Sequence, residues 1–78
     1  MTLSFDTICD REQLHTYIAE KLCFPAYYGR NLAALHDCLG DALLAGTKVT
    51  LAGTDSIRTA LGDYGEKVLD IFAEFGIK

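Results

Sequence analysis

The alternation of hydrophobic and polar residues along this chain predicts two short strands. Residues 2–6 (TLSFD) place Leu3 and Phe5 on one side of an extended segment. Residues 47–52 (TKVTLA) are rich in β-branched side chains and are followed by a glycine, which is typical of a strand that ends in a turn.

Four helices are expected from apolar residues that recur at spacings of three and four positions. Asp10 and Gln13 form a capping pair for the first helix, and Asn31 is a good N-cap for the second. Asp55 is expected to cap a brief third helix, and Gly76 is a usual stop for the last. The expected ranges are 10–22, 32–43, 55–61 and 64–76.

The order strand, two helices, strand, two helices indicates an α/β fold with a small parallel sheet covered by about four helices. The 78 residues, half of them hydrophobic, provide one core, so residues 1–78 are interpreted as a single domain.

Charge and composition narrow the classes of function. The formal net charge of −4 disfavours binding to nucleic acid or to anionic lipid and favours basic protein partners. The N-terminal residues lack the pattern of a signal peptide, and no apolar run reaches the length of a membrane span. Cys9, Cys23 and Cys38 cannot all pair within one chain, so reduced thiols and a cytoplasmic location are expected.

Polar and aromatic side chains are concentrated in residues 24–41 (FPAYYGRNLAALHDCLGD), where catalysis, metal binding and partner recognition are each conceivable. His36, Asp37 and Cys38 are adjacent, but consecutive helical residues point about 100° apart and do not share one face. Spacings typical of zinc ligands and a glycine-rich phosphate loop are both missing from the sequence. No catalytic residue, cofactor or metal is therefore expected, and Cys38 is interpreted as a small residue that packs beside the core.

Two helices each have an acidic face. In the second helix, Asp37 and Asp41 lie opposite the leucines that face the core. In the last helix, Glu66, Asp70 and Glu74 form a stripe of one sign, and Glu74 lies at the end where a negative charge opposes the helix dipole. A binding role for these carboxylates and a plain solvated surface are both compatible with the pattern.

The segment 25–39 resembles the signature of the barstar family, whose members are intracellular inhibitors of secreted, guanyl-specific ribonucleases of the barnase type. The last helix, GEKVLDIFAEF, is also similar to that of the family. The matching positions in the first segment are Pro25, Tyr27, Tyr28, Gly29, Asn31, Leu32, Ala34, Leu35, Asp37, Cys38 and Leu39.

The resemblance implies a three-stranded parallel sheet with four helices, and a protein that blocks a ribonuclease active site with an acidic helix and its preceding loop. It implies that Tyr27 packs against the catalytic cleft and that Asp37 is the central carboxylate, which enters the phosphate site. It also implies an acidic contact from Glu74, whereas Asn31 shapes the loop and the cap.

This chain departs from the family pattern at several positions. Ala33 stands where the family can carry a second acidic contact, and His36 replaces a large aromatic residue. Asp41 adds a carboxylate, and His36 introduces a group that titrates near neutral pH. Either the target enzyme differs or the affinity for a barnase-type ribonuclease is weaker.

The third strand of the family has no counterpart after the last helix. A sheet edge left open could pair with another copy, the sequence could be a shortened version of a longer product, or a helix could protect a two-stranded sheet. The alternative function is therefore a barstar-like module that binds another basic protein or forms a homodimer and does not inhibit a ribonuclease.

Overall fold

Two short strands pair in parallel at one side of the molecule. The computed structural model describes residues 1–77 and places strand β1 at Thr2–Ser4 and strand β2 at Thr50–Ala52. Leu3 lies opposite Leu51 at the centre of the pairing. The expected small parallel sheet is confirmed, and within the described residues it consists of these two strands.

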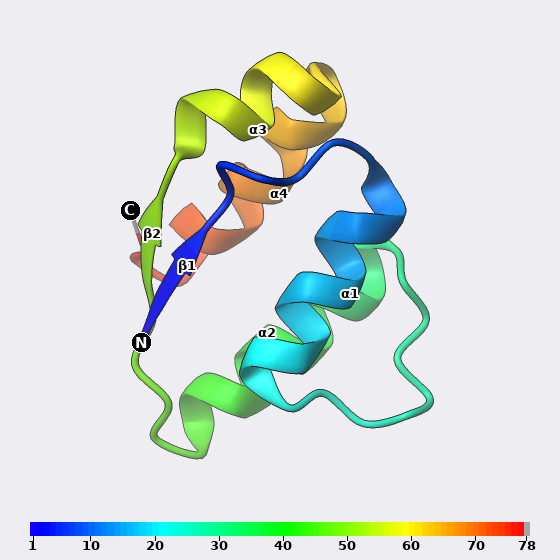
Figure 1. Ribbon diagram of the computed structural model, residues 1–78. Coiled ribbons are helices and arrows are strands. Elements are labelled where there is room, and N and C mark those ends of the chain that lie inside the picture. The colour runs from blue at the N-terminus through cyan, green and yellow to red at the C-terminus, as the bar shows by residue number, and fades with distance from the viewer. Residues whose placement is uncertain (78) are drawn as a thin grey trace.

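All four expected helices are present, and the element order is the α/β order predicted from the sequence. In Figure 1, α1 and α2 lie together on one side of the strands, while α3 lies near the end of β2 with α4 beneath it. The connection from β1 to β2 therefore consists of α1, α2 and the loop between them. The helices are α1 (Arg11–Leu22), α2 (Leu32–Leu44), α3 (Thr54–Leu61) and α4 (Asp63–Glu74).

The first helix begins with the capping pair expected from the sequence. Asp10 Oδ1 accepts a hydrogen bond from the backbone N–H of Gln13 at 2.8 Å. The Gln13 side chain in turn accepts from the backbone N–H of Cys9 at 2.7 Å. One backbone donor in the first turn of the helix and one in the residue before the cap are therefore satisfied.

The prediction that Asp55 caps the third helix is wrong. Asp55 lies inside the first turn of α3, and the residue before the helix is Gly53, which has φ of 70° and makes no side-chain cap. Gly53 fits because a Cβ atom there would lie 2.5 Å from Asp6 Oδ1. The tight turn out of β2 requires a left-handed residue without a side chain, and this requirement shifts the helix start.

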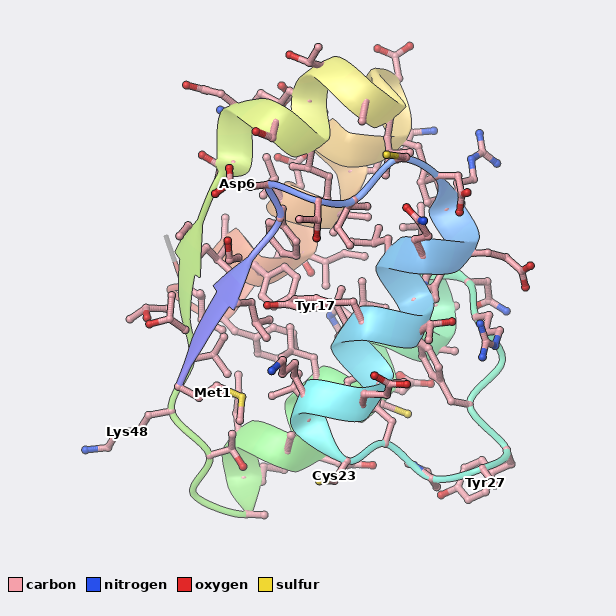
Figure 2. The ribbon with its side chains drawn as sticks, viewed as in Figure 1. Met1, Asp6, Tyr17, Cys23, Tyr27 and Lys48 are labelled. Atoms are coloured by element: carbon pink, nitrogen blue, oxygen red, sulfur yellow. The ribbon has the colours of Figure 1, made fainter. Side chains whose placement is uncertain are left out.

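The hydrophobic core fills the space between the sheet and the helices. Phe5 of the segment after β1 packs against Phe72 of α4, with ring centroids 6.3 Å apart. Tyr17 of α1 is half-buried, and its hydroxyl accepts from the backbone N–H of Ser4 at 2.9 Å; Figure 2 shows its side chain pointing toward the strands. Fully buried apolar residues are Leu3, Phe5, Leu14, Ile18, Leu35, Leu39, Ile57, Val68 and Phe72.

Helices α3 and α4 approach each other closely at Gly65. A Cβ atom built on Gly65 would lie 2.5 Å from the carbonyl oxygen of Ile57. Because this neighbour is backbone, it cannot turn aside as a flexible side chain could. The glycine therefore sets the distance between these two helices.

Candidate functional site

The loop between α1 and α2 separates its two tyrosines. Tyr28 is buried, with 9% of its surface exposed, whereas Tyr27 is 84% exposed. Figure 2 shows Tyr27 at the outer edge of the loop, with its ring lying along that edge. One tyrosine thus anchors the loop, and the other is available to a partner.

The anchor of the loop is a buried histidine. His15 of α1 is 2% exposed, and its Nδ1 lies 2.6 Å from the hydroxyl oxygen of Tyr28. Its Nε2 lies 2.5 Å from the hydroxyl oxygen of Tyr64 at the start of α4. Burial, and secondarily the positive charge of Arg30, lowers the pKa of His15, so the ring is held uncharged between two hydroxyl groups.

Only a weak signal for this role of His15 is present in the sequence. The residue follows Leu14 and lies next to the apolar side of α1, but its partners come from positions 28 and 64. The structure uses both ring nitrogens for structural hydrogen bonds.

Asn31 caps α2, as predicted. Its Oδ1 accepts from the backbone N–H of Ala34 at 2.8 Å, and its Nδ2 donates to the carbonyl oxygen of Gly29 at 3.2 Å. Both polar atoms of the side chain are therefore engaged within the loop and the first turn of the helix.

The predicted division of α2 into a core side and an acidic side is confirmed. Leu35 and Leu39 are fully buried, while Asp37 and Asp41 are exposed and lie one helical turn apart. The side chain of Asp37 is 84% exposed. The buried leucines fix the helix in place, so the two carboxylates are presented on a rigid element.

His36 connects this acidic side to the end of α4. Its Nε2 lies 3.1 Å from Glu74 Oε2, and its Nδ1 lies 3.9 Å from Asp37 Oδ1. The imidazole also packs on Phe75, with ring centroids 5.0 Å apart.

One interpretation of the sequence changes with this geometry. His36 and Asp37 were treated as pointing to separate faces, yet the ends of their side chains approach within 3.9 Å. Phe75, just after α4, is half-buried and supports the ring of His36. The contact with Phe75 was not visible in the sequence, because it depends on how α4 ends against α2.

The acidic stripe of α4 does not by itself indicate a binding surface. Glu66 Oε1 lies 2.7 Å from Arg58 Nε, and Glu74 is paired with His36. Two of the three carboxylates thus have partners within the molecule, while no ion pair is found for Asp70 within residues 1–77. The negative charge of Glu66 is therefore balanced locally by Arg58.

Cys38 lies beside the core, next to a hollow between α2 and the loop. The hollow has a volume of about 260 Å³ and is partly lined by Cys23, Phe24 and Asp41. Burial raises the pKa of the Cys38 thiol, and the nearby carboxylates of Asp41 and Asp37 raise it further. A protonated thiol is a weak nucleophile, so these surroundings favour the predicted packing role.

Within residues 1–77, no cluster of three or more His, Cys, Asp or Glu side chains is arranged to hold a metal ion. In this part of the chain, no helix has the length and apolar character needed to cross a membrane.

Comparison with known proteins gives two matches. Residues 1–77 match the family model described as "Barstar (barnase inhibitor)". A protein of Bacillus subtilis (strain 168) named "Putative ribonuclease inhibitor YrdF" is 41% identical over 63 residues, which is 81% of this chain and 69% of that relative.

Proposed function

This chain belongs to the barstar family, and from that premise we propose that it is a protein inhibitor that blocks the active site of a ribonuclease. The target is a basic, secreted enzyme of the guanyl-specific, barnase type, and the inhibitor acts in the producing cell before export. The protein has no catalytic activity of its own in this proposal. Helix α2 and the loop before it form the contact.

The observation that carries this proposal is the position of Asp37. Its carboxylate is 84% exposed in the middle of a helix whose opposite side is fixed in the core by Leu35 and Leu39. A carboxylate held in this way can imitate a substrate phosphate and accept charge-assisted hydrogen bonds from arginine and lysine. An exposed acidic group on a rigid helix suits a basic catalytic cleft.

The remaining roles follow the same arrangement. Tyr27, a residue that is 84% exposed, packs against the enzyme, and Asp41 extends the acidic side of α2 by one turn. Glu74 contributes from α4, close to α2 because it is paired with His36. Asn31 shapes the loop and is not itself a contact, since its side chain is occupied by Ala34 and Gly29.

Net charge supports the choice of a basic partner. The chain carries a formal charge of −4, and attraction between opposite surfaces accelerates association. Ala33, on the exposed side of the first turn of α2, brings no carboxylate. Asp37 is therefore expected to contribute a larger share of the affinity for a barnase-type enzyme than it would if position 33 also carried a carboxylate.

The test is an RNA-cleavage assay with a barnase-type ribonuclease, into which the protein is titrated. We expect stoichiometric inhibition, and we expect Asp37→Ala to weaken it by about 30-fold or more, the usual threshold for a binding hot spot. Glu20→Ala is the matched control, because it removes one negative charge from an exposed position on α1 and should leave inhibition nearly unchanged. No inhibition by a folded protein at micromolar concentration would reject the proposal.

A second candidate function is supported by the sheet. Among residues 1–77, β2 pairs with β1 on one side and has no strand on its other side, so this edge could accept a second copy. In that case Asp37→Ala would leave self-association intact, while substitutions along residues 47–52 would reduce it. Light scattering during size-exclusion chromatography distinguishes this dimer from the inhibitor.

A further inference from the structure

We propose that the hollow between α2 and the loop before it receives one long basic side chain, a lysine or an arginine, of the ribonuclease. The aliphatic part of that side chain lies on the apolar walls of the hollow, and its charge lies beside Asp41. This inference rests on the proposed function and adds to it the chemistry of one contact.

The size and the walls of the hollow suit such a side chain. Its volume is about 260 Å³, whereas a cavity of about 150 Å³ is enough to hold a benzene molecule. Phe24 and Pro25 of the loop and Ala42 and Ala45 at the end of α2 supply apolar walls. The two alanines carry only methyl groups, so the space between helix and loop is left open. Methylene groups of lysine or arginine are stabilised on a surface of this kind, while the charged end stays close to polar groups.

One carboxylate gives the hollow its charge. Asp41 is the only charged side chain among the described residues that line it. Cys38 lines the same hollow, and after burial the charge of Asp41 is the next cause that raises the pKa of its thiol. Within residues 1–77 Asp41 forms no ion pair, whereas Glu66 is balanced by Arg58. The negative charge at the hollow is therefore available to a cation from a partner.

The end of α2 adds to this negative charge. Asp41 lies in the last turn of the helix, and that turn contains no basic residue. The C-terminal end of a helix carries a partial negative charge, so an acidic side chain there is unfavourable and a cation is favourable. A basic side chain in the hollow would thus be attracted by the carboxylate and by the helix end together.

The hollow also lies between the two elements that the partner is proposed to contact. Asp41 follows Asp37 by four residues, which is about 6 Å along the helix axis. Phe24 and Pro25 begin the loop that presents Tyr27. Asp41 therefore belongs both to the acidic side of α2 and to the hollow, and an enzyme that contacts Asp37 and the loop has the hollow beside its contact.

Two substitutions test the charge and the space separately. Asp41→Asn removes the charge at nearly constant shape, and Ala45→Phe fills the hollow without changing the charge. The inhibition constant for a barnase-type ribonuclease should rise by about tenfold or more in Asp41→Asn, the usual scale for one lost hydrogen bond between charged groups. Ala45→Phe should weaken inhibition by a similar factor, because the basic side chain can no longer enter.

Matched controls carry the same chemical changes at exposed positions outside the hollow. These are Asp63→Asn at the start of α4 and Ala60→Phe on α3, and both should leave inhibition nearly unchanged. The double variant Asp41→Asn/Ala45→Phe should be little weaker than the weaker of the two single variants, because both changes remove one contact. If Asp41→Asn weakens inhibition and Ala45→Phe does not, the partner meets Asp41 on the open surface, and the inference is overturned.

The reactivity of Cys23 is a second readout. Cys23 is exposed in the free protein and lines the hollow; Figure 2 shows it where α1 passes into the loop. In the complex with the ribonuclease, alkylation of Cys23 should slow by about tenfold or more, the factor expected if the thiol is covered for at least nine-tenths of the time. Cys9 should keep its rate. A Cys23 that reacts at its free rate in an inhibited complex would overturn the inference and leave the proposed function intact. A folded protein that does not inhibit the enzyme would reject the proposed function, and the inference with it.

Discussion

His15 Nδ1 lies 2.6 Å from the hydroxyl oxygen of Tyr28, and this buried hydrogen bond joins α1 to the loop that presents Tyr27. The other ring nitrogen reaches Tyr64, so one side chain connects α1, the loop and the start of α4. A neutral imidazole has one donor and one acceptor, and each can be matched by a tyrosine hydroxyl. A charged imidazole has two donors, so both hydroxyl groups would have to accept.

The first prediction is that stability falls as the pH is lowered below about 6.5, the ordinary pKa of histidine. Burial lowers the pKa of His15 in the folded protein. Between that lowered value and 6.5 the unfolded chain binds the additional proton, so protons favour unfolding in this window. Above 6.5 the ring is neutral in both states and contributes no pH dependence.

Urea unfolding at a series of pH values between about 5 and 8 measures this effect. His15→Gln, which cannot titrate, should be less stable at pH 7 and should show a flatter profile below 6.5. His36→Asn is the matched control, because it removes the exposed histidine and leaves His15 in place. An NMR titration midpoint for His15 at or above 6.5 would contradict the prediction.

The two adjacent tyrosines should respond in opposite ways to substitution. Tyr28→Phe removes a buried hydroxyl and leaves a nitrogen of His15 without its partner, which should cost about 1–3 kcal/mol of stability. Tyr27→Ala removes a ring that is 84% exposed, so stability should change by less than about 0.5 kcal/mol while inhibition weakens. Unfolding and inhibition assays on both variants test these separate roles of the two tyrosines. A large loss of stability in Tyr27→Ala would argue against them.

Local chemistry made much of this fold predictable from the sequence. Asp10 and Asn31 cap helices where they were expected, because a cap depends on residues only two or three positions away. The predicted start of α3 was wrong because the turn out of β2 depends on the close contact between Gly53 and Asp6, which are far apart in the sequence.

The same difference between local and long-range contacts applies to the candidate site. The exposed positions of Asp37 and Asp41 could be predicted from helical periodicity alone. The pairing of His36 with Glu74 could not, since it depends on how the end of α4 packs against α2. Contacts between distant segments decide which of the charged side chains are already engaged within the molecule.

Close approach of α3 and α4 gives a further prediction. Gly65→Ala should destabilise the protein by about 1–3 kcal/mol, because its methyl group would lie 2.5 Å from the backbone oxygen of Ile57. Gly40→Ala is the matched control, since the same change in α2 meets only the ring of Phe75, at 3.4 Å. There the gain in helix propensity, up to about 1 kcal/mol, should offset the contact. Equal thermal stability of the two variants would show that the helices can separate to accept the methyl group.

The three thiols should react with an alkylating reagent in a defined order. Cys9 and Cys23 are exposed, whereas Cys38 is half-buried and packs against the core. Burial, with Asp41 and Asp37 nearby, raises the pKa of Cys38, so a smaller fraction of it is the reactive thiolate at pH 8. Cys38 should therefore be modified last in the folded protein, as followed by mass spectrometry of its peptides.

Two comparisons assign the cause of this slow reaction. In about 6 M urea the burial and the neighbouring charges are lost, so Cys38 should react as fast as the other two thiols. Bound to a ribonuclease through α2, Cys38 should become slower still, while Cys9, which lies before α1, should keep its rate. Rapid modification of Cys38 in the folded protein would mean that the thiol is exposed to solvent, and unchanged reactivity in the complex would place the partner on a surface other than α2.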